Sequence, residues 1–333
     1  MSHQAEAAAF LNAKRRWRIW ELALWLAAIA AIFLLPSQLL ILTEIGILGL
    51  FAVSLDLILG YAGIVSLGHT AFFGLGAYAA GILARDYVAE PVTGLAFAGL
   101  VSGIFGLATS FLVLRGSDLT RLMTTFGVAM LLAELGNQMT FLTGGADGLS
   151  GISMSPILGL FEFDLWGRTG YIYCLAVLIG LTFLARRIVH SPFGLSLMAI
   201  KRNPRRAAML GISPKRRIVA IYTVSAAYAG IAGALLTQTT NFVSPDVLAF
   251  HRSADVLLVL VIGGAGYLYG GIFGAIIFTL LRDWLSVATP QYWMFWIGLI
   301  LVAIVMIGRE RLTGWPGLLA ARFRGGKISE DVR

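Results

Sequence analysis

A small polar group stands at the start of an otherwise apolar segment, in the order Ser66, His69 and Thr70. The stretch before and within it is broken by three glycines, Gly60, Gly63 and Gly68. Polar side chains are costly in hydrocarbon, so they usually face the interior of a helix bundle or a water-filled path. Irregular backbone at membrane depth is tolerated in the same two places. We therefore expect these hydroxyl and imidazole groups to line a translocation pathway, although His69 could equally be a packing histidine bonded to a neighbouring carbonyl.

Covalent chemistry has no comparable support in the sequence. The chain has no His-Glu-x-x-His motif, no Ser/His dyad, no cluster of metal ligands and no Walker A motif. Cys174 is the single cysteine, so an internal disulfide is impossible. The sequence thus predicts a protein that is not an enzyme and has neither a cofactor nor a metal site.

Composition indicates a polytopic membrane protein of all-α class. The 333 residues are 58% hydrophobic and 13% charged, with a mean hydropathy of +0.85. Apolar runs of about 20 residues, the length that crosses a bilayer, recur along the chain. We predict about ten spans, at 19–35, 39–59, 64–84, 92–114, 122–142, 169–185, 218–240, 253–266, 271–288 and 291–308. They form a transmembrane domain, 19–308, between an interfacial N-terminus, 1–18, and a basic tail, 309–333.

The distribution of positive charge sets the expected topology. Of 25 Lys and Arg residues, 19 fall within 14–18, 186–217 and 309–333. Basic loops of membrane proteins stay in the cytoplasm. The net charge of +8 therefore indicates how the chain is oriented in the membrane and does not indicate nucleic-acid binding. Ten spans place all three clusters and both termini in the cytoplasm, with the loop 143–168 outside. This count requires the apolar run 253–281 to break at glycines, and the candidates are Gly263, Gly264 and Gly266.

The basic loop 186–217 contains the signals of a short helix. Asn203 is a good N-cap, Pro204 suits the first helical position, and Gly211 can take the left-handed conformation that ends a helix. We expect a projecting helix that docks on a partner, with Ala207 and Leu210 in the contact and Arg205 and Arg206 at its rim. The alternative is an ordinary connector that its charge holds to anionic lipid.

Small residues recur at helical spacing and predict close helix packing in lipid. Two such faces are Ala98, Ser102 and Gly106, and Ala226, Gly230 and Ala234.

Four collinear stretches resemble one known family. They are GYAGIVSLGHTAFFGLGAY at 60–78, LTGGADGLSGI at 142–152, the run from 193 through SAAYAGIAGALL (225–236) and NFVSPD (241–246), and VLVIGGAGYLYGGIFGAI at 259–276. Together they resemble the larger permease type of ABC importers for branched-chain (hydrophobic) amino acids. At one place the sequence departs from the family, which often has a Glu where this chain has Pro204.

The resemblance implies a permease subunit of the bacterial inner membrane that moves a branched-chain amino acid or a similar small polar metabolite. It implies four kinds of partner: a second homologous permease, two cytoplasmic ATPase subunits, a periplasmic binding protein and membrane lipid. The segment around 204–210 matches the part of the family that couples to the ATPase. The alternative is an ion-coupled secondary transporter, which would need paired carboxylates at mid-membrane. Glu134 stands alone there, whereas Glu44, Asp56 and Asp255 lie near span ends.

Overall fold

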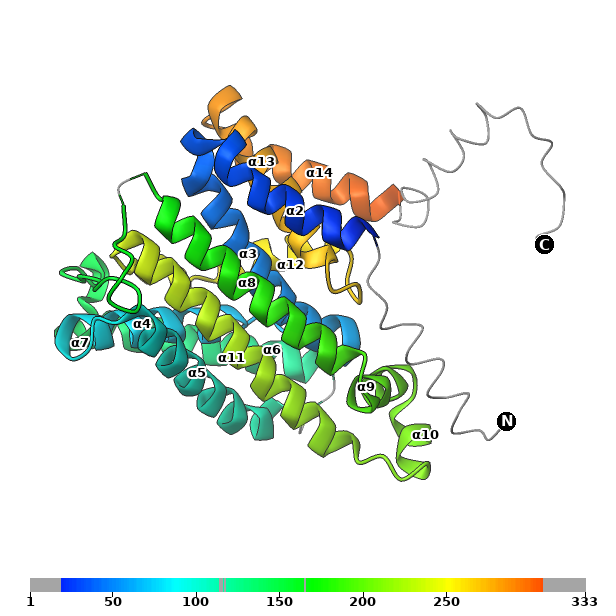
Figure 1. Cartoon of the computed structure of the whole chain (residues 1–333). Coiled ribbons are helices and arrows are strands. Elements are labelled where there is room, and N and C mark those ends of the chain that lie inside the picture. Colours follow the sequence, from blue (N-terminus) through cyan, green and yellow to red (C-terminus); the bar gives the residue numbers. More distant parts are fainter. Residues whose placement is uncertain (1–18, 114–115, 117, 165, 308–333) are drawn as a thin grey trace, which may run out of the picture. The chain divides into compact units, whose positions relative to one another are not determined.

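The computed structural model describes residues 19–113, 116, 118–164 and 166–307, and the predicted N-terminus and tail lie outside this part (Figure 1). Within the described residues every regular element is a helix, apart from two isolated backbone bridges. The larger helices are α2 (Ile19–Leu34), α3 (Leu39–Asp56), α4 (Thr70–Asp86), α5 (Pro91–Val113), α6 (Asp118–Gln138), α8 (Arg168–Val189), α9 (Pro192–Arg202), α11 (Pro214–Thr240), α12 (Phe250–Gly263), α13 (Gly270–Ala288) and α14 (Trp293–Ile307). Shorter pieces are η1 (Pro36–Gln38), η2 (Leu57–Tyr61), α7 (Thr140–Thr143), η3 (Gly145–Asp147), α10 (Pro204–Met209) and η4 (Pro245–Leu248).

Each of the ten predicted spans coincides with one of these helices. Within the part of the chain that the structure describes, six segments are long and apolar enough to cross a membrane, at 36–61, 91–113, 118–138, 168–189, 214–240 and 270–288. The helices at the other four positions are shorter, with 16 residues in α2, 17 in α4, 14 in α12 and 15 in α14. The all-helical membrane bundle is therefore confirmed, and the count of ten spans stays a prediction.

The chain divides into two compact units, and each is described by itself. The first ends at Thr279 and holds the helices α2 to α12 and the first half of α13. The second begins at Leu280 and holds the rest of α13 and the apolar helix α14.

Close packing of α11 against α4 and α5 forms the centre of the first unit (Figure 1). A Cβ placed on Gly230 of α11 would lie 2.2 Å from Ser102 Oγ of α5, and one on Gly233 would lie 1.9 Å from the carbonyl oxygen of Phe73 on α4. The two small-residue faces expected from the sequence therefore meet each other. Such contacts let helix backbones approach closely where lipid provides no hydrophobic driving force.

The backbone after α3 is irregular over a longer stretch than we predicted. α3 passes into the π-helical turn η2, and the next helix, α4, begins at Thr70 and not at 64. Gly63 has a φ of +75°, and a Cβ on Gly68 would lie 1.8 Å from the carbonyl oxygen of Thr125 on α6. The glycines at 60, 63 and 68 thus permit a non-helical segment that is packed against protein. Non-helical backbone at membrane depth is tolerated where protein surrounds it.

The predicted break in the apolar run 253–281 is confirmed. α12 ends at Gly263 and α13 begins at Gly270. Gly264 and Gly266 have φ values of +99° and +85°, which favour glycine because it has no Cβ.

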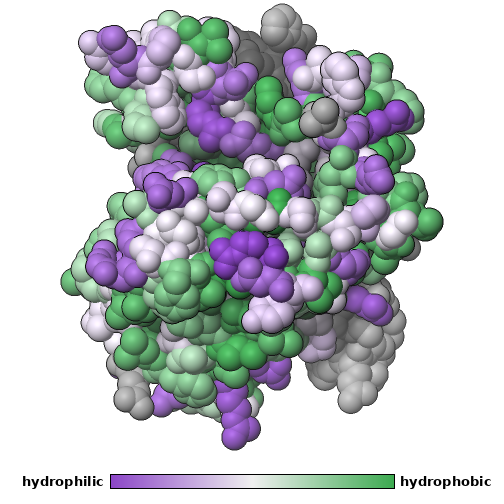
Figure 2. All heavy atoms as spheres, turned by 90° about the vertical axis from the view of Figure 1, so that its left-hand side faces the viewer, coloured by the Kyte–Doolittle hydropathy of each residue, from purple (hydrophilic) through white to green (hydrophobic). Residues whose placement is uncertain are grey.

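The loop 143–168 lies at one end of the bundle (Figure 1) and exposes apolar as well as acidic side chains, with Leu160, Phe161 and Trp166 among the apolar ones. Asp147, Glu162 and Asp164 are all exposed, and a backbone bridge joins Leu149 to Val243. Figure 2 looks onto the left-hand side of Figure 1, where this loop lies, and shows hydrophilic residues distributed among hydrophobic ones. The end of the first unit that carries α9 and α10 lies opposite this loop (Figure 1).

Candidate functional site

The short helix that the sequence predicts in the basic loop is α10, which follows α9. In α10, Asn203 Oδ1 accepts a hydrogen bond of 3.0 Å from the backbone N–H of Arg206, so Asn203 is the N-cap. Gly211 has a φ of +81° and ends the segment, with its N–H donating to the Ala208 carbonyl at 3.0 Å. The predicted cap, first-turn proline and terminating glycine are all confirmed as structure.

The apolar surface of α10 differs from our expectation. Ala207 is only 2% exposed within this chain, so its side chain is not available to a partner. Met209 and Leu210 are 86% and 79% exposed, and Arg205 and Arg206 are exposed beside them. The expectation that Ala207 contacts a partner is wrong, because its methyl group packs inward and holds the helix to its own chain. The exposed apolar tip consists of Met209 and Leu210.

α9 connects this tip to the bundle. Ser191 is its N-cap and accepts from the N–H of Gly194, while Leu197 and Ile200 are fully buried. The guanidinium of Arg217, at the start of α11, lies 5.2 Å from the centre of the Phe193 ring. α9 is therefore an amphipathic helix with a buried apolar face and basic residues at its end.

His69 occupies a polar centre inside the bundle. Its Nε2 lies 2.9 Å from Ser54 Oγ on α3 and 3.4 Å from Ser225 Oγ on α11. The imidazole stacks on Phe51 and meets Phe72 edge-on, with ring centroids 5.6 and 5.5 Å away. These contacts support the packing interpretation of His69 in the conformation described.

Thr70, next to His69 in the sequence, is fully buried, and so is Ser66. Thr70 Oγ1 lies 2.9 Å from Ser253 Oγ on α12. The structure thus brings His69 and Thr70 together with Ser54, Ser225 and Ser253, which sequence reasoning missed. A single serine inside an apolar run is a weak signal, and only packing shows that three helices aim their serines at one place.

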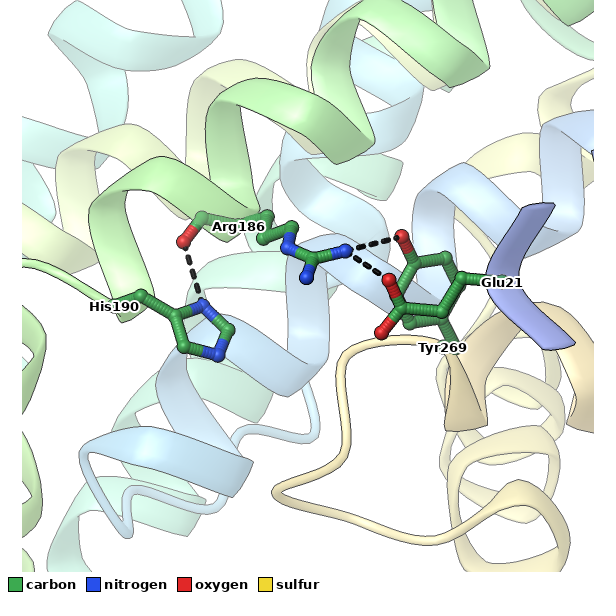
Figure 3. A network of polar contacts seen from close by, with 4 residues as sticks. All are labelled: Glu21, Arg186, His190 and Tyr269. Atoms are coloured by element: carbon green, nitrogen blue, oxygen red, sulfur yellow. Dashed lines mark hydrogen bonds and ion pairs between the residues drawn. The ribbon is translucent and has the colours of Figure 1, made fainter. Parts of the chain in front are cut away.

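Arg186 forms a buried ion pair that the charge pattern did not predict. Its guanidinium donates to the carboxylate of Glu21 on α2 and, at 3.3 Å, to the hydroxyl of Tyr269 (Figure 3). Arg186 and Glu21 are only 5% and 6% exposed. His190 Nδ1 lies 2.9 Å from the Arg186 carbonyl, one turn further along α8. Arg186 therefore belongs to the packed end of α8 and not to the exposed charge of the predicted loop 186–217.

α6 is the least buried of the membrane-length helices, with only Thr125 and Ala129 buried. Glu134 and Gln138 are exposed, and Gln138 Nε2 donates to Glu134 Oε1 at 2.8 Å. This end of α6 presents polar groups, with Asn137 also exposed, beside exposed apolar residues such as Leu131 and Leu135.

A cavity of about 370 Å³ lies between α4, α5 and α6. Its lining is almost entirely apolar and includes Leu75, Tyr78, Phe97, Leu132, Met139 and Leu248. Among the described residues, no three His, Cys, Asp or Glu side chains lie close enough to hold a metal ion.

Comparison with known proteins places these features in a family. Residues 37–305 match the family model described as the permease component of branched-chain amino acid transport systems. The high-affinity branched-chain amino acid transport permease LivM of Salmonella typhimurium is 31% identical, over 80% of this chain and 66% of its own length. The permease LivH of the same organism is 31% identical over 31% of this chain and 34% of its own, and its galactose/methyl galactoside import permease MglC is 26% identical over 62% of each.

The chain thus spans slightly less than two thirds of the length of LivM. No solved structure matches it. The match to the family model covers most of the helices described above, including α9, α10 and the helices around His69. The chain is a multi-pass membrane protein that belongs to the permease components of branched-chain amino acid transport systems.

Proposed function

We propose that this chain is a transmembrane subunit of an ATP-driven uptake system in the bacterial inner membrane. With a second, homologous permease it forms the path for a substrate that a periplasmic binding protein delivers. ATP is hydrolysed on two separate cytoplasmic ATPase subunits. The exposed apolar tip of α10 carries this proposal, because Met209 and Leu210 project from a capped helix at one end of the bundle.

Contact with a partner explains the exposed Met209 and Leu210 better than contact with water does. A helix of six residues is marginal in water and needs other contacts to stay ordered. The chain supplies some of them through Ala207. A partner groove that receives Met209 and Leu210 would supply the rest, with Arg205 and Arg206 steering the approach.

The exposed face of α6 supports a second membrane-spanning partner. Glu134 and Gln138 would be costly against lipid tails, so they favour a protein or aqueous neighbour. The relatives offer a candidate for that neighbour, since LivM and LivH are both permease proteins of branched-chain amino acid transport in one organism.

The apolar cavity supports an apolar substrate over a sugar. A pocket lined by Leu75, Phe97, Leu132 and Leu248 can receive a branched aliphatic side chain. It offers few of the polar partners that sugar hydroxyls, or the ammonium and carboxylate of an amino acid, need when they leave water, so it suits the aliphatic side chain alone. We therefore propose a branched-chain amino acid as the substrate, as for LivM and unlike MglC.

Reconstitution tests the proposal. The chain is purified with the neighbouring gene products, placed in liposomes with the binding protein, and assayed for uptake of radiolabelled leucine and galactose. We expect leucine uptake that requires ATP and the binding protein. Leucine uptake by this chain alone, driven by a proton or sodium gradient, would overturn the proposal in favour of a secondary transporter.

A further inference from the structure

Three distant parts of the chain meet at the end of α3. The buried carboxylate of Asp56 accepts a hydrogen bond of 2.7 Å from the backbone N–H of Gly266, in the loop between α12 and α13. The ammonium of Lys201, on α9, donates a hydrogen bond of 2.7 Å to the carbonyl of Gly60 in the π-helical turn. We name this contact region, formed by Asp56, Gly60, Lys201 and Gly266, the α3 junction.

The α3 junction leaves little free space. A Cβ on Gly60 would lie 2.0 Å from Asp56 Oδ1 and 2.4 Å from the nitrogen of Gly266. The stem of Lys201 crosses Gly63, where a Cβ would lie 2.8 Å from Lys201 Cγ. The backbones of Gly60 and Gly266 are in contact with each other, and α9 joins them through the Lys201 side chain. A displacement of α9 must therefore move the end of α3 and the α12–α13 loop or break the Lys201 hydrogen bond.

On one side the α3 junction is continuous with the docking tip. Lys201 lies two residues before the N-cap Asn203, whose N–H donates to Ala199 of α9 at 3.0 Å. α9 and α10 are therefore hydrogen-bonded to each other through the residue that caps α10. Met209 and Leu210 are thus connected to Lys201 through α10, its N-cap Asn203 and the last residue of α9.

On the other side the α3 junction leads to the polar centre. Ser54, which contacts His69, lies two residues before Asp56 on α3. Ser225 of α11 donates to the Ser54 carbonyl at 2.5 Å. Contacts thus run without interruption from α10 through Lys201 and the end of α3 to His69.

Arg186 holds the other end of the same loop. Its guanidinium binds Tyr269, the last residue before α13, and also Glu21 (Figure 3). Trp20 packs edge-on against the Tyr269 ring, with centroids 5.1 Å apart. The loop between α12 and α13 is therefore held at Gly266 by Asp56 of α3 and at Tyr269 by Arg186 of α8, the helix that leads into α9.

We propose that Lys201 is the positioning residue through which docking at α10 controls the α3 junction and, beyond it, the polar centre. This inference rests on the proposed function. A helix end leaves backbone carbonyls without partners in the helix, and a lysine ammonium can satisfy one of them. Here that ammonium comes from the element that moves when the ATPase moves. Lys201 therefore links docking at α10 to the arrangement of the α3 junction, and it does not contact the substrate.

The test replaces Lys201 by methionine, which keeps an unbranched stem and removes the donor. Lys201→Arg restores a donor, and Lys215→Met is the control for loss of charge, because Lys215, at the start of α11, is, like Lys201, an exposed lysine of the same basic loop. Each variant is purified as the complete complex in liposomes. The measurements are ATPase co-purification, melting temperature, ATP hydrolysis with and without the loaded binding protein, and substrate uptake per ATP.

We expect Lys201→Met to assemble and melt like the unaltered protein. Its uptake per ATP should fall by about fivefold or more, the lower range of coupling between linked sites. Stimulation of hydrolysis by the loaded binding protein should fall with it, while Lys201→Arg recovers and Lys215→Met is unaffected.

Two results would overturn the inference alone. One is unchanged uptake per ATP in Lys201→Met within a complex whose unaltered form is coupled. The other is a loss that follows melting temperature and that Lys201→Arg does not recover, since this would mark a purely structural lysine. If the unaltered chain binds no ATPase and takes up substrate without ATP, the proposed function itself fails and the inference with it.

Discussion

Truncation of the α10 tip gives a quantitative prediction. Leu210→Ala removes the γ carbon and both δ carbons from a side chain that is 79% exposed in this chain. At about 0.8 kcal/mol for each buried methylene, burying the exposed share against a partner contributes about 2 kcal/mol. Because about 1.4 kcal/mol corresponds to a tenfold change, the Kd for the ATPase subunit should rise about 25-fold.

The chain's own fold should not respond to this change. Leu210 is the C-cap of α10 and its side chain makes few contacts with the rest of the chain. The assay is titration of labelled ATPase subunit onto the permease in nanodiscs, with melting temperature recorded in parallel. Leu210→Met is the matched control, because it keeps apolar volume and should change the Kd by less than about threefold.

A small change in Kd would contradict burial of the tip on docking. A Kd that rises by less than about threefold in both Leu210→Ala and Met209→Ala would show that the tip is not buried on docking. The same would follow if the Kd rose only in proportion to a fall in melting temperature.

Three further predictions concern the bundle itself. In a Cys174→Ala background, an impermeant thiol reagent applied outside the cell should label Ser150→Cys and spare Ser213→Cys, and the opposite pattern would reverse the topology. His69→Leu should lower the free energy of unfolding by about 0.5–1.5 kcal/mol, because it removes one of the hydrogen bonds of the Ser54 hydroxyl, which keeps its bond to the Phe51 carbonyl; an unchanged denaturation midpoint with reduced uptake would instead favour a pathway role. Gly230→Ala should cost about 1–3 kcal/mol, because the new Cβ would lie 2.2 Å from Ser102 Oγ; Ser102→Gly should recover part of the loss, and a Gly230→Ala protein as stable as the unaltered one would contradict the close packing.

The two ends of α10 could be predicted from residues that act locally. Asn203, Pro204 and Gly211 act on their own backbone neighbours, so the sequence predicts both ends of α10 correctly. The break between α12 and α13 follows from glycine for the same reason. Which face of a short helix points inward depends on distant residues, so the orientation of Ala207 was predicted wrongly.

The polar contacts between distant segments could not be predicted. Glu21 and Arg186 are separated by 165 residues, and nothing local to either identifies its partner. Residues 57–69 are apolar and glycine-rich like the helices around them, so composition did not distinguish the π-helical turn and the irregular segment from the start of a span.

The glycine contacts of the first unit bear on how the permease changes shape. At Gly76, Gly230 and Gly233 neighbouring helices touch backbone to backbone, so α4, α5 and α11 have no side-chain layer in which to slide. These three helices must therefore move as a single rigid block. We expect any rearrangement that opens the path to one side of the membrane to displace this block as a unit relative to the helices around it.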